Sequence, residues 1–461
     1  MACARQQQPG DRQAKRGRIM PNVFDVLKER GFVQQVTDEA AVREAFDRGK
    51  VTCYIGFDPT AESLHVGSLL PIMGLAHLLR QGHHPIAILG VGTALIGDPS
   101  GKTEMRQMLS REQIEQNAEG VGAQLQHYLT WNGVSALVVD NFEWLGDLRY
   151  VDFLRDIGRH FSVNRMLAVE AYKMRLESGL SFIEFNYQLL QAYDYLVLYR
   201  RHGCTLQMGG DDQWGNILAG VDLIRRVEGA EVQGVTFPLI TTATGEKMGK
   251  TASGAVWLDE KKTSPYEFYQ YWVNADDRDV ARFLAYFTFL PMEEIRRVEA
   301  LQGDQLNGAK AVLAYEVTKL AHGEAEARKA LSAAQQVFGG REIPEDLLPS
   351  SDIPRGLVIH PHAADATATA GLEGVTIPDA VPTTSIDSAR MEAGIPAVEL
   401  FVEVGLASSK SEARRLINQG GAYVNDERVG DIGRILSTSD LIGRELILRA
   451  GKKKHHRVVA K

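Results

Sequence analysis

The sequence predicts an α/β protein built on a doubly wound parallel sheet, followed by a helical domain and a small α+β domain. Short apolar runs alternate with helical patterns between residue 51 and about residue 241, which is typical of βαβ units. The pattern is then helical to about residue 339, and residues 391–461 combine one capped helix with two hairpins. Ligands of doubly wound sheets bind at the carboxyl ends of the strands, so the loops after the strands hold the candidate sites.

The expected strands are short apolar runs bounded by Gly, Pro or polar residues, and the expected helices carry apolar residues at helical spacing. The strands cover residues 51–57, 85–91, 136–141, 205–209 and 235–241, and the helices cover residues 66–81, 111–129, 182–202 and 213–227. Together they form a Rossmann-like catalytic domain, expected at residues 21–260.

The helical domain is expected at residues 261–339, with breaks at Asp277 and Gly323. Residues 340–390 are rich in Pro, Ser, Thr, Ala and Asp and show little periodicity, which predicts a linker or a loosely ordered segment.

The last domain is expected at residues 391–461. Ser409 and Glu412 have the spacing of a capping box, and the helix that they open is expected to end at Gly420. Residues 422–429 and 445–459 are expected to form hairpins.

Composition excludes several classes of protein. The apolar fraction of 44% and the charged fraction of 24% are ordinary for a globular protein. The sequence contains no run of eighteen apolar residues, so no membrane span is predicted. The three cysteines, Cys3, Cys53 and Cys204, have no paired spacing. This pattern disfavours a disulfide framework or a metal site in the protein, and it fits a cytoplasmic location.

Charge is unevenly distributed along the chain. The net charge is −8, but residues 391–461 carry 12 Lys or Arg and 9 Asp or Glu, a net of +3, which leaves −11 on the rest. A basic terminal domain on an acidic body is compatible with a polyanionic partner, although on charge alone a solvated surface is the default interpretation. Residues 1–20 carry five Lys or Arg and one Asp, with no apolar stretch, and are expected to be a disordered basic tail rather than a secretory signal.

The segment FDPTAESLHVGS, residues 57–68, joins the first expected strand to the first expected helix. A helix N-terminus exposes unpaired N–H groups and attracts phosphate. Gly56 and Gly67 allow the backbone to approach a ligand closely, and His65 can donate to an oxyanion. On this segment alone, a helix-capping loop with a surface histidine explains the pattern as well.

A second loop strengthens the phosphate interpretation. Residues 244–251 present Lys247 and Lys250 after a strand, which suits charge stabilisation on a polyphosphate, although a solvated turn is the usual place for two lysines. His65-Val-Gly-Ser68 resembles the His-Ile-Gly-His signature of class I aminoacyl-tRNA synthetases. Residues 247–251 resemble their Lys-Met-Ser-Lys-Ser loop, in the same order along the chain.

The expected helix at residues 182–202 carries Tyr187, Gln191 and Asp194 on one face. An exposed polar stripe is the default interpretation of such a face. Its neighbours are largely apolar, however, and polar groups in an apolar neighbourhood need partners or a ligand. The helix is therefore predicted to line a polar pocket.

Four further segments, 54–60, 95–101, 185–194 and 207–216, look like those of the bacterial tyrosyl-tRNA synthetases, and residues 263–272 extend the likeness. The last domain is similar to an RNA-binding domain of the S-four type. The resemblance covers roughly nine-tenths of the chain. It implies a ligase that activates L-tyrosine with ATP and transfers the tyrosyl group to the terminal adenosine of tRNA(Tyr).

The resemblance also implies roles for individual residues. Tyr54 and Asp194 would bind the tyrosine hydroxyl, and the tyrosine ammonium group would lie among Asp98, Tyr187, Gln191 and Gln213. ATP would be bound by Gly56, Asp58, Thr60, His65, Gly67, Ser68, Gly210, Asp212 and Lys250. The catalytic group would be His65, Lys102, Arg106, Lys247, Lys250 and Thr251. The tRNA would be bound by Lys410, Arg414, Arg415, Lys452, Lys453 and Lys454.

The remaining expectations concern partners and departures from the family pattern. The family implies a homodimer, and Mg²⁺ is expected to bind mainly through the phosphates of ATP. Ser68 replaces the second signature histidine, Gly249 and Thr251 replace serines, and Asp211 adds negative charge beside the expected adenosine site. Two other functions remain open: a tryptophanyl-tRNA synthetase, which shares the architecture, and a synthetase-derived RNA-binding protein without catalysis. The tryptophanyl-tRNA synthetase is disfavoured by the pair Tyr54 and Asp194. The non-catalytic RNA-binding protein is disfavoured by the presence of His65, Asp98 and Lys250.

Overall fold

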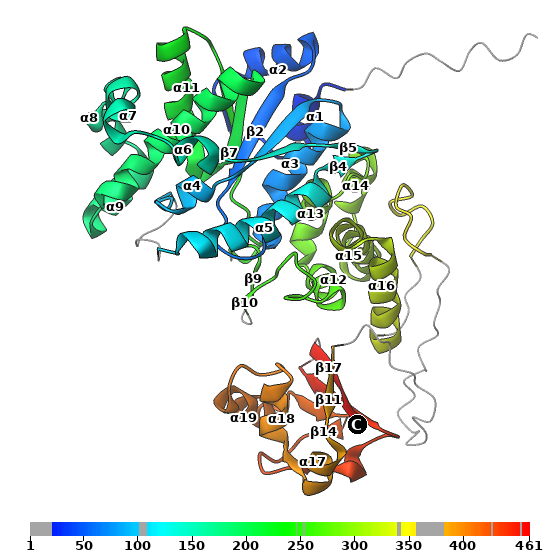
Figure 1. Cartoon of the computed structure of the whole chain (residues 1–461). Helices are drawn as coiled ribbons and strands as arrows, with labels where there is room; N and C mark the ends of the chain where they lie inside the picture. The colour runs from blue at the N-terminus through cyan, green and yellow to red at the C-terminus, as the bar shows by residue number, and fades with distance from the viewer. Residues whose placement is uncertain are drawn as a thin grey trace, which may run out of the picture.

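The structure is a computed structural model. It describes residues 21–100, 108–245, 247–251, 254–338, 343–355, 382–425, 427–451 and 454–461. The expected basic tail, residues 1–20, lies outside these residues. Figure 1 shows the sheet with its flanking helices, the helical domain beside it, and the C-terminal domain as a separate unit.

The predicted parallel sheet is confirmed. Its strand order is β1-β8-β7-β2-β3-β6, and the five strands from β8 to β6 run parallel. The order reverses between β2 and β7, which follow each other in space but not in sequence; such a switch point is where doubly wound sheets bind ligands. The strands are β1 (Gln35–Val36), β2 (Thr52–Phe57), β3 (His84–Leu89), β6 (Leu137–Asp140), β7 (Leu206–Gly210) and β8 (Gln233–Phe237). Strand β1, antiparallel to β8, escapes sequence patterning because it has only two residues.

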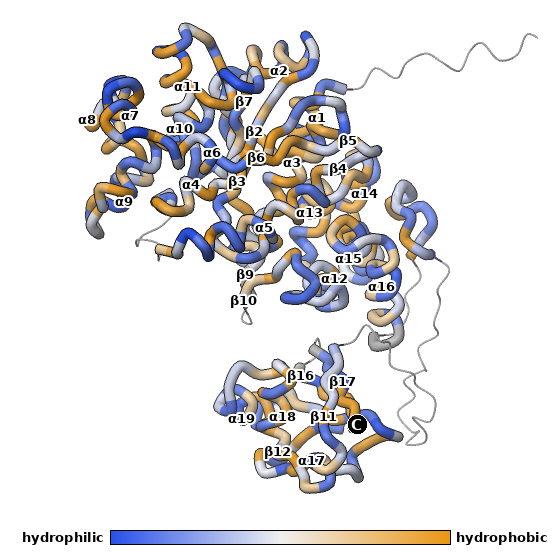
Figure 2. The backbone as a smooth tube through the Cα atoms, viewed as in Figure 1, coloured by the Kyte–Doolittle hydropathy of each residue, from blue (hydrophilic) through white to orange (hydrophobic). Residues whose placement is uncertain are grey.

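The four predicted helices of this domain are present. They are α3 (Leu69–Arg80), α5 (Arg111–Tyr128), α10 (Phe182–His202) and α11 (Trp214–Glu228). The first begins later than expected, because a 3₁₀ turn at Val66–Ser68 precedes it. Figure 2 shows α3 as a mostly hydrophobic helix, in keeping with its burial between the sheet and the helical domain.

Several short helices were not predicted from the sequence. Helices α1 (Val23–Glu29) and α2 (Glu39–Arg48) precede the sheet. Helices α7 (Tyr150–Asp156), α8 (Val163–Leu167) and α9 (Glu170–Ser178) form an outlying group before α10 (Figure 1). Helices of fewer than three turns carry too few residues to show a clear helical period.

The helical domain shares one hydrophobic core with the sheet domain. It contains α12 (Pro265–Val273), α13 (Val280–Phe287), α14 (Met292–Val298), α15 (Leu306–His322) and α16 (Glu324–Phe338). The predicted breaks are confirmed as the 3₁₀ turn η4 (Asp277–Asp279) and as Gly323 between α15 and α16. Arg30 follows α1 and ties the two domains together, because its buried guanidinium donates to the carbonyls of Ala285, Thr288 and Leu290.

Part of the segment expected to be a loose linker is packed. Residues 343–355 lie against the helical domain, with Ile343, Leu348 and Ile353 buried in its core. Glu294 on α14 accepts the backbone N–H of Ser350 at 3.1 Å. The Ser351 hydroxyl donates to Glu316 on α15 at 2.6 Å. These contacts are spread over thirteen positions without helix or strand period, so the pattern does not show in the sequence.

The C-terminal domain has its own core and a sheet in the order β11-β17-β16-β13-β14. The predicted hairpins are confirmed as β13–β14 and β16–β17. Strand β11 pairs in parallel with β17, so the domain begins before the expected boundary at residue 391. A polar strand of four residues gives no apolar run that marks it as part of a core. The elements are β11 (Thr383–Ile386), α17 (Ser388–Ala393), α18 (Ala397–Glu403), α19 (Lys410–Asn418), β13 (Ala422–Val424), β14 (Glu427–Arg428), β16 (Glu445–Ala450) and β17 (Lys454–Ala460).

The predicted capping box of α19 is only half formed. The Ser409 hydroxyl accepts the backbone N–H of Glu412 at 3.2 Å. The Glu412 carboxylate, however, accepts the N–H of Ser408 at 2.7 Å and not that of Ser409. The helix start is as expected, and the reciprocal bond is displaced by one residue.

Candidate active site

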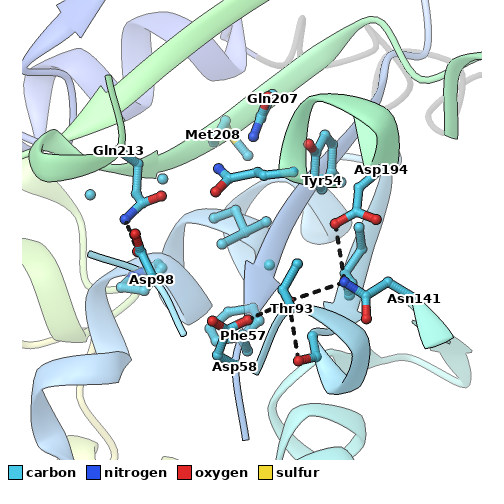
Figure 3. Close-up of a pocket in the computed structure, with 18 of the residues that line it drawn as sticks. Tyr54, Phe57, Asp58, Thr93, Asp98, Asn141, Asp194, Gln207, Met208 and Gln213 are labelled. Carbon is cyan, nitrogen blue, oxygen red and sulfur yellow. Dashed lines mark hydrogen bonds between the residues drawn. The ribbon is translucent and has the colours of Figure 1, made fainter. Parts of the chain in front are cut away.

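A pocket of about 350 Å³ lies at the carboxyl ends of β2 and β7, at the switch point of the sheet (Figure 3). This is the position that the doubly wound topology predicts. Helix α10 closes one side of it. The predicted residues that line the pocket are Tyr54, Gly56, Asp58, Thr60, Gly67, Ser68, Asp98, Tyr187, Gln191, Asp194, Gly210, Asp212 and Gln213.

The deep end of the pocket is formed by Tyr54 on β2 and Asp194 on α10, which are 2% and 3% exposed. The Trp144 indole donates to Asp194 Oδ1 at 2.7 Å, and the Asn141 amide donates to Oδ2 at 3.1 Å. The Tyr54 hydroxyl is buried without a hydrogen-bond partner among the described residues. A buried hydroxyl normally has a partner, so this end of the pocket is built to receive a polar group of a ligand.

Burial is the main cause of the pKa shifts of Tyr54 and Asp194. It raises the pKa of Asp194 to about 8, against the opposing effect of the two N–H donors. Burial, and next the nearby Asp194, also raise the pKa of Tyr54 well above its ordinary value. Tyr54 therefore remains a hydroxyl donor at neutral pH, and Asp194 becomes an ionised acceptor as the pH rises through about 8.

A chain of hydrogen bonds connects the deep end to the joint that follows β2 (Figure 3). Asn141 donates to the Thr93 hydroxyl at 3.1 Å, and Thr93 donates to Asp58 Oδ1 at 2.8 Å. The other oxygen of Asp58 accepts the Tyr187 hydroxyl at 2.9 Å. Gly90 leaves room for this network, because a Cβ there would lie 2.1 Å from Asp58 Oδ1.

Three of these residues, Thr93, Asn141 and Trp144, were missed in the sequence. Asn141 ends the expected strand 136–141, so the rule that sites lie at carboxyl ends of strands was a usable signal for it. Trp144 lies on the short helix α6 (Phe142–Leu145). Nothing local marks it as a partner of a residue fifty positions later.

The opposite side of the pocket is organised by Asp98. Its Oδ2 accepts the Gln213 amide at 2.7 Å, and its Oδ1 accepts the N–H of Ser100 at 2.9 Å. Partial desolvation and the Asp98 charge raise the pKa of the nearby Asp212. With Asp58 and Asp194, these residues give the pocket four carboxyl groups, which suits a ligand with a positively charged group.

The structure shows His65 as a cap of the joint. Its Nδ1 accepts the N–H of Gly67 at 2.9 Å, as the capping interpretation of the segment predicted. The same ring lies edge-on to Trp257, 6.3 Å away between ring centroids. His65 adjoins the pocket through Gly67 and Ser68, which line it, so the capping and ligand-binding interpretations are compatible.

The lysine loop, defined here as residues 241–251, touches this joint. A Cβ on Gly249 would lie 3.0 Å from the N of Gly67 and 3.3 Å from His65 Nδ1, and Gly249 has φ +83°. Glycine in place of the family serine therefore fits both the backbone conformation and the close approach. Lys247 is exposed, and its charge opposes the rise in the pKa of Asp212.

The return segment after the loop is hydrogen-bonded to the joint. Val66 donates its N–H to the carbonyl of Val256, and Leu258 donates to the carbonyl of Leu64, each at 2.9 Å. The structure therefore brings the two signature segments together across most of the length of the domain, as the resemblance implied.

Asp211 lies beside the pocket without lining it. Its Oδ1 accepts from Gln35 Nε2 at 2.7 Å and from the Thr236 hydroxyl at 2.8 Å, on β1 and β8 at the edge of the sheet. Its charge nevertheless contributes to the raised pKa of Asp212, so the expected negative charge beside the adenosine site stays a prediction.

Some predicted residues lie outside the described structure. Lys102, Arg106, Lys452 and Lys453 are not among the described residues, and the side chains of Lys250, Thr251 and Lys454 are not described. On α19, Lys410 pairs with Glu399 at 2.6 Å, whereas Arg414 and Arg415 are exposed.

The described residues contain no group of three or more His, Cys, Asp or Glu side chains arranged to hold a metal ion. Among them there is also no helix with the length and apolar character needed to cross a membrane.

Comparison with known proteins places these features in a family. Residues 47–339 match the family model "tRNA synthetases class I (W and Y)", and residues 375–458 match the "Tyrosine--tRNA ligase SYY-like C-terminal domain". The chain is 57% identical to the tyrosine–tRNA ligase of Desulfosudis oleivorans over 95% of this chain and 99% of the relative. It is 56% identical to that of Desulfatibacillum aliphaticivorans over 95% and 98%.

A solved structure agrees with the sequence relatives. The C-terminally truncated mitochondrial tyrosyl-tRNA synthetase of Aspergillus nidulans superposes with a TM-score of 0.62 at 32% identity. The match covers 69% of this chain and 94% of that chain.

Proposed function

Because the chain belongs to the tyrosine–tRNA ligases, a family of class I aminoacyl-tRNA synthetases, we propose that it charges tRNA(Tyr) with L-tyrosine. In the first step tyrosine and ATP give tyrosyl-adenylate and pyrophosphate. In the second step the tyrosyl group passes to the terminal adenosine of the tRNA. The observation that carries the choice of amino acid is the buried pair Tyr54 and Asp194 at the closed end of the pocket.

Tyrosine selection rests on this pair. The Tyr54 hydroxyl would donate to the substrate phenol oxygen, and Asp194 would accept a hydrogen bond from the phenol hydroxyl. Indole and phenylalanine carry no phenol hydroxyl, so they would leave the buried Tyr54 hydroxyl without a partner and Asp194 without its substrate donor, which is costly. The substrate ammonium group would lie among Asp98, Tyr187, Gln191 and Gln213, in the acidic part of the pocket.

ATP would occupy the open side of the pocket, beside the helix start after the joint. Gly56 and Gly67 would allow the phosphates to approach the backbone, and Asp212 would accept hydroxyls of the ribose. Asp58, Thr60, His65, Ser68, Gly210 and Lys250 complete the proposed ATP contacts.

The chemistry needs no protein nucleophile. An oxygen of the tyrosine carboxylate attacks the α-phosphorus, and the bond from that phosphorus to the bridging oxygen of pyrophosphate breaks. The protein positions the reactants and stabilises the charge that develops on the phosphates. The groups proposed for this task are His65, Lys102, Arg106, Lys247, Lys250 and Thr251.

We propose that Mg²⁺ enters with ATP and is held mainly by its phosphates. The pocket carboxylates Asp58, Asp98 and Asp194 each already accept two hydrogen bonds from the protein. Such an arrangement fits an ion that keeps several waters and binds through substrate phosphates.

A homodimer is proposed on the outlying helices α7 to α10. Tyr150, Val151, Val163, Leu176 and Phe182 are each more than half exposed there, between 51% and 75%. Exposed apolar side chains gathered on neighbouring elements mark an interaction surface. Phe182→Asp should dissociate the dimer in analytical ultracentrifugation, with the exposed Met108→Asp as a control that leaves it intact.

The tRNA is proposed to bind the C-terminal domain through α19 and the turn after β16. Lys410, Arg414, Arg415, Lys452, Lys453 and Lys454 would contact phosphates, the interactions that dominate nucleic-acid affinity. We also propose a cytoplasmic location, which suits the buried free thiols of Cys53 and Cys204.

The test is ATP–pyrophosphate exchange with each of the twenty amino acids, on the unaltered chain and on Asp194→Ala. Exchange should depend on tyrosine, and the variant should lose most of its preference for tyrosine over phenylalanine. A site built for a hydroxyl can discriminate by about 10⁵-fold, a magnitude that comes from a tyrosyl-tRNA synthetase itself. Exchange driven by tryptophan, or no exchange with any amino acid, would contradict the proposal.

A further inference from the structure

We propose that Asp279 and Arg282, in the helical domain, are positioning residues that hold the neck of the lysine loop and so place Lys247 for adenylate formation. The inference rests on the proposed function, because it assigns a role within that reaction. It concerns two residues that lie outside the pocket and belong to no signature segment.

The lysine loop is a hairpin with a defined neck. Thr241 and Lys247 face each other as an antiparallel bridge. Met248 donates its N–H to the carbonyl of Ile240 at 3.1 Å, and Gly245 closes the turn by donating to Thr242 at 2.8 Å. The backbone of Lys247 therefore lies directly opposite that of Thr241 in the hairpin. Contacts that position Thr241 also position Lys247.

Asp279 and Arg282 hold that outgoing limb of the loop. Asp279 Oδ2 accepts the backbone N–H of Ala243 at 2.8 Å, and Arg282 donates to the carbonyl of Thr241 at 2.7 Å. The two side chains also form an ion pair with each other. They therefore satisfy one donor and one acceptor of the loop backbone with charged groups, which make stronger hydrogen bonds than neutral ones.

The position of Asp279 indicates that the contact with the loop is its main role. Asp279 is the N-cap residue of α13, yet its side chain makes no capping hydrogen bond to that helix. An Asp at an N-cap normally accepts an N–H from the first turn of its own helix. Here the carboxylate is 2% exposed and is turned to the sheet domain. The N–H of Ala243 in that domain and Arg282 on α13 compensate its burial.

The return limb is held by other groups. Gly249 donates its N–H to the Tyr271 hydroxyl on α12 at 3.3 Å, and Val256 donates to the carbonyl of Gly249 at 2.9 Å. The loop is therefore fixed on both limbs, by Asp279 and Arg282 on the outgoing side and by Tyr271 and Val256 on the return side. Loss of the outgoing anchor would leave Lys247 on a neck held from one side only.

The test compares Asp279→Ala, Asp279→Asn and Arg282→Ala with a matched control, Arg278→Ala. Arg278 lies one turn earlier, is exposed, and pairs with Asp276 at 2.8 and 3.0 Å, with no hydrogen bond or ion pair to the lysine loop among the described residues. Single-turnover formation of tyrosyl-adenylate should fall by about 10- to 100-fold in Asp279→Ala, since a small misplacement of a catalytic group can cost about that much. It should fall less in Asp279→Asn, whose amide oxygen can still accept the N–H of Ala243, and in Arg282→Ala, which leaves Asp279 bound to Ala243. It should not change in Arg278→Ala.

Equilibrium binding of tyrosine separates positioning from folding. It should be unchanged in all four variants, because the tyrosine pocket does not touch the loop neck. Unaltered adenylate formation in Asp279→Ala, or a loss of tyrosine binding equal to the loss of rate, would overturn the inference. If Asp279→Ala does not fold, Asp279→Asn, which has nearly the same volume, and Arg282→Ala, at a side chain 40% exposed, decide the question in the same way. Tyrosine-dependent exchange by the unaltered enzyme tests the proposed function separately.

Discussion

The pH dependence of the choice between tyrosine and phenylalanine tests the chemistry at the deep end of the pocket. Burial raises the pKa of Asp194 to about 8, and the side chains of Trp144 and Asn141 both donate hydrogen bonds to its carboxylate. The tyrosine hydroxyl would be a third donor to the same carboxylate. Tyrosine should therefore bind the ionised form, and below about pH 8 its binding should release the proton of Asp194.

The size of the effect follows from this value. Each pH unit below the pKa lowers the ionised fraction by about tenfold. The ratio of kcat/KM for tyrosine to that for phenylalanine should rise about tenfold per pH unit up to about pH 8, and then level off. The ratio is the informative quantity, because both substrates share the same ammonium and carboxylate groups and their titrations cancel.

Trp144→Phe changes the titration without emptying the space. It removes an N–H that donates to Asp194 at 2.7 Å. A hydrogen bond to a charged group contributes about 1.5–3 kcal/mol, which corresponds to about 1–2 pKa units. The pH at which selectivity levels off should therefore move upward by about 1–2 units. Trp131→Phe is the matched control, since Trp131 lies 40% exposed on the hairpin β4–β5 (Thr130–Trp131, Val134–Ser135), away from the pocket.

The assay is ATP–pyrophosphate exchange with each amino acid across a pH series, on the unaltered enzyme and both variants. A selectivity ratio that stays flat with pH would refute the ionisation argument. A levelling point that does not move in Trp144→Phe would refute the role of the indole, and a shift in Trp131→Phe would show that the effect is not local.

Three further predictions follow from the same structure. The pKa of Asp194 is about 8 in the folded protein and about 3.8 in the unfolded chain, so its contribution to the free energy of unfolding is present below about pH 3.8 and is lost as the pH rises through about 8. Asp194→Asn should flatten the resulting fall of the unfolding temperature with pH. An unchanged profile would contradict the raised pKa. Lys250→Ala should slow single-turnover adenylate formation by about 10²–10³-fold and leave tyrosine affinity unchanged; a collapse of tyrosine affinity at a normal rate would show that the role is wrong. Removal of all residues after Arg355 should preserve exchange but greatly reduce tRNA charging and flatten the salt dependence of tRNA binding; normal charging with an unaltered salt slope would exclude the C-terminal domain as the tRNA anchor.

The sequence predicted those parts of the site that have a local pattern. Tyr187, Gln191 and Asp194 recur at helical spacing, so a helix face located them. Tyr54 lies within the apolar strand β2, and the family resemblance assigned its role. Trp144 and Asn141 act only through contacts with Asp194 made by the tertiary fold, and no local pattern records such a contact. The same holds for Asp279, which reads as an ordinary helix cap in the sequence but binds the lysine loop in the structure.

Strand β11 and residues 343–355 show a second limit of sequence patterning. Strand β11 has only one buried residue, Ile386, because it lies at the edge of its sheet and joins it through backbone hydrogen bonds. Residues 343–355 are held by scattered apolar anchors and by Glu294. Elements that are stabilised mainly by backbone or single-residue contacts show little hydrophobic periodicity in the sequence. Strand β11 and residues 343–355 were therefore both assigned to the predicted linker from their composition.

The distribution of charge explains why the lysines stand on a separately held loop. The pocket wall carries Asp58, Asp98, Asp194 and Asp212 on strand ends, their following loops and α10, an arrangement that attracts an ammonium group. A lysine fixed inside this wall would pair with the carboxylates and weaken the amino-acid site. Placing Lys247 on a hairpin anchored by the helical domain keeps the cation at the rim, beside Asp212, where phosphate charge would develop. Substitutions in the wall should therefore change amino-acid selection, and substitutions at the loop anchors should change the rate of adenylate formation.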